Sequence, residues 1–263
     1  MDPYAPKILL VDDDELNCRM MGLLLSEKGY NYDTAFNGVE AFEAVQARTY
    51  NIVLMDIQMP VMNGFEATRK IREWEAQNGH VPIVALTAML LDDEVQNCLS
   101  AGMDDCIAKP FDSETLFSLI EKYIDKPEQT TLINGLHNSA LADKLELLDI
   151  QEALPWFGMD VEMYRDFLNE FIDNLPRRID QFQTTFSSGD FKLLANHAHN
   201  LKGISASMGA MQLSYLSQKL DQKCQDGDPF AVRQALEELE NHINTFMNEA
   251  KTILSGYTGQ HER

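Results

Sequence analysis

Short apolar runs alternate with helical repeats of apolar and polar residues through the first half of the chain. The run KILLV at 7–11 precedes a 3.6-residue repeat over 15–28, and Gly29 closes that repeat. The alternation recurs four more times. It predicts strands at 7–11, 32–36, 51–55, 82–86 and 106–108, and helices at 15–28, 38–47, 64–77, up to 101–102 and at 113–123. Buried strands that alternate with helices favour a parallel sheet covered on both faces.

From about Asp149 onward the apolar positions follow helical spacing throughout. Four long amphipathic segments are separated by short loops that contain Gly or Pro, at 163–186, 191–208, 211–224 and 230–254. Pro176 lies inside the first segment and is expected to kink or divide it. These segments favour an antiparallel four-helix bundle.

The stretch between the two patterns holds Pro127, Gly135 and several small polar residues, which is typical of a linker. We therefore predict an α/β domain, a linker, an all-α domain and a short tail, at 1–125, 126–148, 149–255 and 256–263.

The chain carries a net charge of −21, which disfavours binding to nucleic acid or to anionic lipid. No apolar run approaches the roughly 18 residues of a membrane span, and the N-terminal residues do not resemble a leader. We expect a soluble, cytoplasmic protein whose partners are other proteins. The four cysteines, Cys18, Cys98, Cys106 and Cys224, lack metal-ligand spacing and are expected to be buried free thiols.

Polar residues follow four of the predicted strands. Asp12 and Asp13 follow the first, Asp56 ends the third, and Thr87 and Lys109 follow the fourth and fifth. Because parallel strands present their carboxyl ends at one edge, these side chains should converge there. Three close carboxylates repel one another unless a cation lies among them, and oxygen ligands suit Mg²⁺. Asp14 and Glu15, by contrast, are best explained as a helix N-cap and its first turn.

The motifs LLVDDD, LMDIQMPVMNG, ALTA and AKPF, in this order, resemble the receiver domain of two-component response regulators. The resemblance covers about residues 5–125 and implies a flavodoxin-like, doubly wound five-stranded sheet. It implies that Asp56 accepts a phosphoryl group as an acyl phosphate, with Thr87 and Lys109 contacting the phosphoryl oxygens.

The same resemblance implies the Mg²⁺ ligands. Asp13, Asp56 and the main-chain carbonyl of Gln58 would bind the ion, and Asp12 would help to hold it through water. Pro60 and Gly64 would shape the loop beside Asp56, and the bond between Lys109 and Pro110 would be cis.

Two positions separate this chain from related patterns. Receivers usually carry an aromatic residue three positions before the lysine, where this chain has Cys106. The haloacid dehalogenase class of phosphatase, another user of an aspartyl phosphate, has a second Asp two residues after its nucleophile. Gln58 stands there, which counts against a hydrolase.

Two histidines lie close together on the predicted helix 191–208. At about 100° per residue, an apolar stripe should face the core, formed by Leu194, Ala198, Leu201, Ile204, Ser205 and Met208. His197 lies at the margin of this stripe and is expected to be a packing residue. His199 lies about 170° from its centre and is expected to point into water among small side chains.

The run from His199 to Gly203, HNLKG, resembles the signature of histidine phosphotransfer (HPt) domains, which are four-helix bundles. The match extends over about residues 150–254. It implies that His199 carries a phosphoryl group, that Lys202 places positive charge near it and that Gly203 leaves it room.

These resemblances imply a phosphorelay carrier that receives phosphoryl from a separate sensor histidine kinase and passes it to a downstream response regulator. The chain has no phosphate-binding glycine loop of the ATP-binding families, so we expect no ATP-dependent kinase activity. Alternatives are a protein-binding switch controlled by Asp56 phosphorylation, the C-terminal portion of a hybrid sensor kinase, and a Mg²⁺-dependent hydrolase. The start at Met1 weakly favours a standalone protein over the hybrid kinase.

Overall fold

The computed structural model describes residues 6–75, 79–87, 92–109, 111–124 and 148–257. The chain forms two compact units, at 1–140 and 141–263. The predicted linker lies outside the described residues except for its last residue, Leu148, and so do the last six residues of the predicted tail. The predicted domain boundaries therefore stay predictions.

The first unit contains a five-stranded parallel sheet with the order β2-β1-β3-β4-β5. Its strands are β1 (Lys7–Val11), β2 (Asn31–Ala35), β3 (Ile52–Asp56), β4 (Ile83–Thr87) and β5 (Asp105–Ala108). This is the strand order of flavodoxin-like doubly wound sheets, as predicted, with the switch in strand order between β1 and β3. The ends of β1 and β3 are therefore the expected place for a site.

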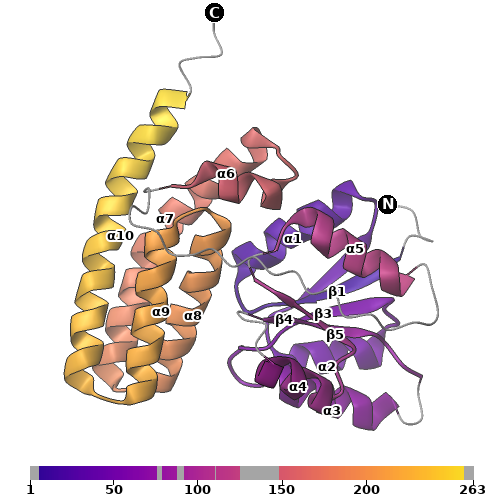
Figure 1. Ribbon diagram of the computed structural model, residues 1–263. Coiled ribbons are helices and arrows are strands. Elements are labelled where there is room, and N and C mark those ends of the chain that lie inside the picture. The colour runs from indigo at the N-terminus through magenta and orange to yellow at the C-terminus, as the bar shows by residue number, and fades with distance from the viewer. Residues whose placement is uncertain (1–5, 76–78, 88–91, 110, 125–147, 258–263) are drawn as a thin grey trace, which may run out of the picture. The chain divides into compact units, whose positions relative to one another are not determined.

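Helices cover both faces of this sheet, as Figure 1 shows. On one face lie α1 (Glu15–Glu27) and α5 (Ser113–Ile124). The other face carries α2 (Gly38–Ala47), α3 (Gly64–Glu75) and α4 (Asp92–Ala101). The predicted end of the third helix, at 76–77, lies outside the described residues.

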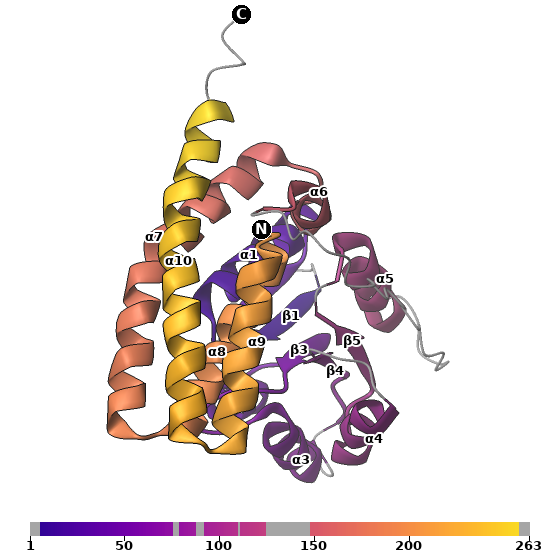
Figure 2. The same ribbon diagram turned by 60° about the vertical axis from the view of Figure 1, so that its left-hand side comes forward.

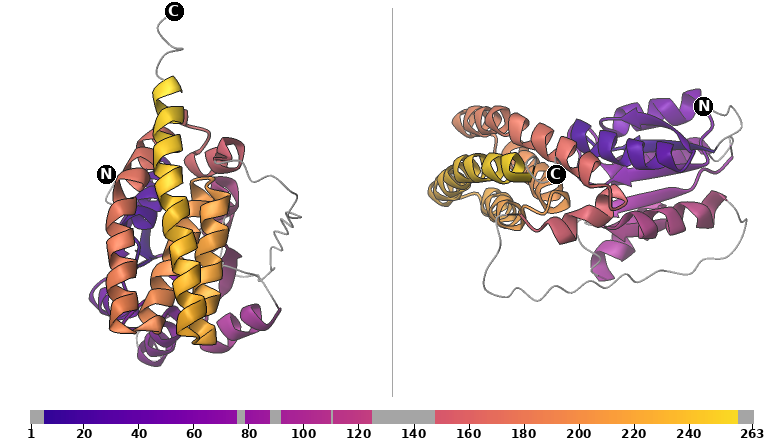
Figure 3. Two further views of the ribbon diagram at one scale, coloured as in Figure 1. Left: turned by 90° about the vertical axis from the view of Figure 1, so that its left-hand side faces the viewer. Right: turned by 90° about the horizontal axis from the view of Figure 1, so that it is seen from above.

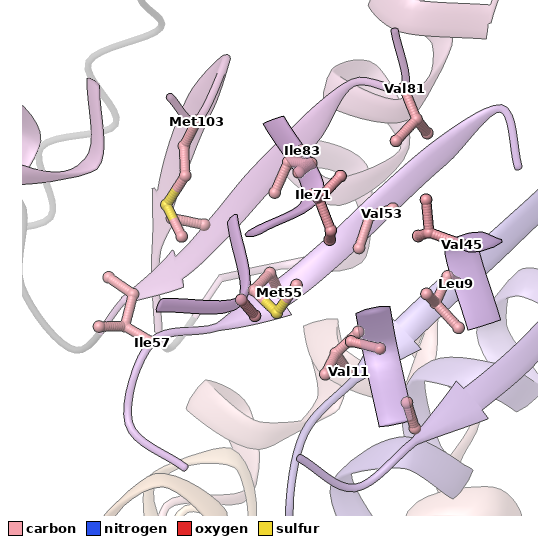
Figure 4. Close-up of a cluster of buried hydrophobic side chains, with 14 of the residues drawn as sticks. Leu9, Val11, Val45, Val53, Met55, Ile57, Ile71, Val81, Ile83 and Met103 are labelled. Carbon is pink, nitrogen blue, oxygen red and sulfur yellow. The ribbon is translucent and has the colours of Figure 1, made fainter. Parts of the chain in front are cut away.

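Alternate residues of the central strands bury themselves in the two layers of helices. Figure 4 shows the layer toward α2, α3 and α4, where Leu9, Val11, Val53 and Met55 of β1 and β3 are fully buried. Each such side chain stabilises the fold by about 1.5–3 kcal/mol when it leaves water. This burial keeps the carboxyl ends of β1 and β3 side by side.

Strand β2 begins and ends one residue earlier than the sequence pattern predicts. Its pairing with β1 runs from Lys7 opposite Asn31 to Val11 opposite Ala35. Phe36 lies beyond this ladder, because its N–H donates to the side chain of Glu40 at 2.8 Å. The sequence pattern places Phe36 in the strand because aromatic residues favour strands, whereas the pairing with β1 ends at Ala35.

The second unit is helical, as predicted. Its long helices are α7 (Val161–Ser188), α8 (Phe191–Ser207), α9 (Met211–Asp226) and α10 (Pro229–Tyr257). Helix α8 packs against α7 and α9, and α10 packs against the same two helices, so the four lie side by side (Figures 2 and 3). Two short helices, α6 (Ile150–Ala153) and η1 (Leu154–Phe157), precede them.

Pro176 does not divide its helix, because α7 continues from Val161 to Ser188. That alternative of the sequence prediction is wrong. The apolar side of α7 is buried on both sides of the proline, at Phe171 and Phe182 for example, and this packing holds the helix together despite the missing N–H.

The turn between α8 and α9 is tied to the start of the unit. Gly209 has φ +76°, and its carbonyl accepts a hydrogen bond from the N–H of Asp149 at 2.9 Å. The carbonyl of Met208 accepts another from the hydroxyl of Tyr164 on α7, at 3.0 Å. These bonds fix the geometry with which α8 and α9 meet.

We expect Gly209→Ala to destabilise the helical unit far more than Gly227→Ala. Both glycines have φ near +75°, which costs an alanine about 1–2 kcal/mol. A Cβ at Gly209 would in addition lie 2.2 Å from the carbonyl oxygen of Asp149, whereas a Cβ at Gly227 would meet no heavy atom within 4 Å.

The measurement is urea unfolding of the full chain followed by the indole N–H NMR signal of Trp156, which belongs to this unit. A loss of stability in Gly209→Ala at least twice that in Gly227→Ala is expected. Equal losses would show that the tie to Asp149 relaxes without cost.

Candidate functional site

The strand register brings the predicted polar residues to one edge of the sheet. Val11 pairs with Met55 across β1 and β3, so Asp12 and Asp56 follow at the same level. Asp56 pairs with Leu86 of β4, and Thr87 pairs with Ala108 of β5, which Lys109 follows. Four residues that lie far apart in the sequence are thus brought to the carboxyl ends of four strands, at one edge of the sheet.

Lys109 joins the two acids that follow β1 and end β3. Its Nζ lies 2.7 Å from Oδ2 of Asp12 and 2.8 Å from Oδ2 of Asp56. The two carboxylates are almost fully buried, with 1% and 6% of the side chains exposed. A single ammonium group therefore compensates two carboxylates that water reaches poorly.

Burial and charge shift the pKa values of this cluster. Burial, together with repulsion from Asp56 and Asp14, raises the pKa of Asp12 to about 6, although Lys109 opposes the change. Burial alone would lower the pKa of Lys109, but the carboxylates of Asp12 and Asp56 raise it above its usual range. Lys109 therefore stays charged at neutral pH. The other oxygen of Asp12 accepts from the main-chain N–H of Asp14 at 2.9 Å and from the amide of Asn17 at 3.2 Å.

Asp13 completes a group of acids that fits a hard divalent cation. Asp12, Asp13 and Asp56 can each offer one oxygen atom, and these atoms lie within 4.8 Å of one another. Three carboxylates and one ammonium leave the cluster negative. An all-oxygen donor set of this charge suits Mg²⁺.

The loop after Asp56 approaches this residue closely. A Cβ at Gly64 would lie 2.3 Å from the main-chain oxygen of Asp56, so only glycine fits there. Val61, in the same loop, has φ +68°, a conformation that β-branched residues rarely adopt. The N–H of Gln58 donates to Oδ1 of Asp56 at 3.3 Å, and the side chain of Gln58 is exposed.

Two further predictions about this region differ in their outcome. Asp14 is the N-cap of α1, where its side chain accepts from the N–H groups of Leu16 and Asn17, as predicted. Pro110 lies outside the described residues, so the predicted cis bond stays a prediction.

Cys106 occupies the position where receivers usually have an aromatic residue. It is buried at the end of the sheet and shares a hydrogen bond with the thiol of Cys98 on α4. That bond lowers the pKa of Cys106 and, together with burial, raises that of Cys98. All four cysteines are buried and free, as predicted. The contact between Cys98 and Cys106 was not predictable, because it joins α4 to β5 across a turn.

His199 is less exposed than the helical geometry of α8 predicts. Only 12% of its side chain is exposed, and Nδ1 lies 3.6 Å from Oδ2 of Asp221 on α9. The prediction that it points into water is wrong, because it considered α8 alone and α9 packs close beside it. Asp221 was not among the predicted site residues, because it lies on α9 and no motif marks it.

Two other predictions for α8 are confirmed, those for the apolar stripe and for His197. The stripe from Leu194 to Met208 is buried. His197 packs at the edge of the core against Phe182, with ring centroids 6.4 Å apart, and burial lowers its pKa. Lys202 is partly buried, and a Cβ at Gly203 would meet no heavy atom within 4 Å, so space is open beside this turn.

Two family models match the chain. Residues 8–121 match the response regulator receiver domain, and residues 166–249 match the Hpt domain. The chain is a receiver domain fused to an HPt domain. The matched ranges contain the acidic cluster and His199, respectively.

The fused arrangement aligns with sensor kinases along most of the chain. The chain is 30% identical to the sensor histidine kinase GacS of Pseudomonas protegens over 258 residues, which are 94% of this chain and 27% of the relative. It is also 30% identical to the aerobic respiration control sensor protein ArcB of Escherichia coli over 217 residues, which are 82% of this chain and 28% of the relative. The chain therefore spans about a quarter of the length of the curated relatives it matches.

Among solved structures, the receiver domain of the sensor histidine kinase PA1611 from Pseudomonas aeruginosa is 36% identical. The alignment covers 47% of this chain and 100% of that receiver domain, with a TM-score of 0.43.

None of the helices in the described part of the chain is both long enough and apolar enough to cross a bilayer.

We expect Lys109→Met to destabilise the receiver domain by about 3–5 kcal/mol in the absence of divalent cations, because it leaves two buried carboxylates without their shared cation. Millimolar Mg²⁺ should restore part of this stability by binding the same acids. The measurement is urea unfolding followed by the indole N–H signal of Trp74 on α3.

Lys122→Met is the matched control, because Lys122 also pairs with a buried carboxylate, that of Asp105, at 2.8 Å. Its acidic cluster is intact, so Mg²⁺ should stabilise it only as much as it stabilises the wild type, whereas Lys109→Met should gain more. A gain in Lys109→Met no larger than that in Lys122→Met would contradict a cation that takes over the charge of Lys109.

Proposed function

We propose that this protein is a phosphorelay carrier in which Asp56 accepts a phosphoryl group and His199 carries it further. The observation that carries the proposal is the cluster of Lys109 with Asp12 and Asp56, at 2.7 and 2.8 Å, within a receiver domain. Phosphoryl transfer requires positioning and charge neutralisation more than covalent chemistry, and this cluster can supply both.

Asp56 is the nucleophile. A carboxylate oxygen forms a bond to phosphorus as the bond from phosphorus to the donor breaks, and the product is an acyl phosphate. Lys109 then neutralises the phosphoryl oxygens, and the hydroxyl of Thr87, at the end of the neighbouring strand β4, donates to them. Asp12, Asp13, Asp56 and the main-chain carbonyl of Gln58 would hold Mg²⁺, which when bound supplies positive charge to those oxygens.

His199 is the second carrier. A neutral imidazole nitrogen can attack the acyl phosphate near pH 7, and the resulting phosphoramidate can donate to another carboxylate. Lys202, one helical turn away, contributes positive charge, and the open space at Gly203 leaves room for the phosphoryl oxygens.

The proposed partners follow from this chemistry. A sensor histidine kinase supplies the phosphoryl group, and the receiver domain of a downstream response regulator accepts it. The chain itself acts as a carrier and not as an ATP-dependent kinase.

A direct test follows the label. The full chain, loaded with ³²P from a small acyl phosphate in the presence of Mg²⁺, should first carry base-labile label on Asp56 and then base-stable label on His199. Asp56→Asn should carry neither, and His199→Gln should keep the base-labile label only. A chelator of divalent cations should prevent loading in the wild type and in His199→Gln.

Base-labile label that persists equally in the wild type and in His199→Gln would refute transfer to the histidine. His197→Gln is the matched control, because His197 lies on the same helix but packs against Phe182. It should transfer label as the wild type does.

The alignments support a second candidate, in which the same two domains work as the C-terminal portion of a hybrid sensor kinase. Receiver and HPt sequences like these align with about a quarter of GacS and of ArcB. The transfer chemistry is the same in both candidates, and only the location of the kinase differs. An immunoblot of native cells decides between them: a band at the mass of 263 residues supports the separate carrier, and a much larger band supports the hybrid kinase.

A further inference from the structure

Asp221 lies beside the ring of His199 within the helical unit. Its Oδ2 is 3.6 Å from Nδ1 of His199, and the two side chains are 13% and 12% exposed. The residues come from adjacent helices, α9 and α8, which pack closely along their lengths. The HNLKG motif does not predict an acid at this place, because Asp221 follows the motif by 18 residues.

The carboxylate of Asp221 is held in this orientation by a neighbour on its own helix. Gln225, one turn along α9, donates from Nε2 to Oδ1 of Asp221 at 2.9 Å. One oxygen of the carboxylate therefore bonds to the amide, and the other is directed to the imidazole. At 3.6 Å the contact with the ring is longer than a hydrogen bond, as is common for pairs that tighten only when the reaction partner is bound.

The chemistry of the two groups decides which ring nitrogen can react. A neutral imidazole has one N–H donor and one nitrogen with a free lone pair, and an ionised carboxylate can only accept. The nitrogen that faces Asp221 is therefore favoured as the N–H donor. The lone pair is then on Nε2, on the opposite side of the ring.

We propose that Asp221 is a positioning residue for phosphoryl transfer: it holds the proton of His199 on Nδ1, so that Nε2 forms the bond to phosphorus. This inference rests on the proposed function of His199 and extends it. Gln225 supports it by fixing the carboxylate.

The step is balanced without a proton leaving the ring. The lone pair of Nε2 forms the N–P bond, and the bond between phosphorus and the carboxyl oxygen of the donor breaks, returning its electron pair to the donor carboxylate. The ring keeps the proton on Nδ1 and becomes positively charged. Asp221 faces that charge and stabilises it, which helps formation of the phosphohistidine and keeps it ready to donate.

The first test uses the wild-type chain alone, so it does not depend on the stability of any variant. With ¹⁵N-labelled histidine, long-range ¹⁵N–¹H spectra near pH 7.5 report which nitrogen of His199 carries the proton. The Nδ1–H form should predominate. A predominant Nε2–H form would overturn the proposal.

The second test compares Asp221→Asn and Asp221→Ala with Asp226→Asn. Asp226 is an aspartate of the same helix that pairs with Lys223 at 2.8 Å and is the matched control. First-order transfer of label from Asp56 to His199 should slow by about 10- to 100-fold in Asp221→Ala, the size of effect seen when the partner that orients a metal-ligating histidine is removed. Asp221→Asn keeps an acceptor but loses the charge, so its rate should be intermediate. Asp226→Asn should transfer at the wild-type rate.

The tautomer in the variants separates positioning from a structural role. In Asp221→Ala the share of Nε2–H at His199 should rise, while the signal of Trp156 keeps its wild-type position. Slower transfer with an unchanged tautomer would refute positioning by Asp221. Absence of label from His199 in the wild type would refute the proposed function instead, and the tautomer of His199 would still report on the pair.

Discussion

One partly buried ammonium group between two buried carboxylates is the interaction on which the receiver domain depends. Asp12 and Asp56 stand at the ends of adjacent strands, and each is nearly removed from water. Their charges would repel strongly in this medium without Lys109. The three residues come from β1, β3 and the end of β5, so their electrostatic balance requires the whole sheet to be assembled in register.

The same balance of charges explains why the cluster suits a bound cation. Lys109 compensates two acids, and Asp13 adds a third, so negative charge remains for a hard cation. In the proposed function, a phosphoryl group on Asp56 would change this balance again, because it would bring its own negative charge next to Lys109. Addition of one group at Asp56 would thus perturb a cluster that ties several strands together, and this would give the proposed phosphorylation a physical effect on the sheet.

In the helical unit the charges are reversed: the partner of the imidazole is an acid. Its proposed carrier, His199, has an imidazole that would become positive on taking up phosphorus, and the carboxylate of Asp221 lies beside it. The placement depends on the α8–α9 turn, where bonds from Asp149 and Tyr164 hold the residues around Gly209. In both domains the proposed nucleophile is accompanied by a charged partner from a neighbouring element, and packing decides the distance.

The sequence by itself determined the succession of strands and helices, the parallel sheet, the helical second half and the convergence of Asp12, Asp56, Thr87 and Lys109. These features are readable because burial imposes periods of two and 3.6 residues and because parallel strands share one edge. Tertiary structure alone decided the exposure of His199, its pairing with Asp221, the contact of Cys98 with Cys106 and the continuity of α7 through Pro176. Each of these depends on which neighbouring element packs against a residue, and the periodicity of a single helix or strand contains no information about its neighbours.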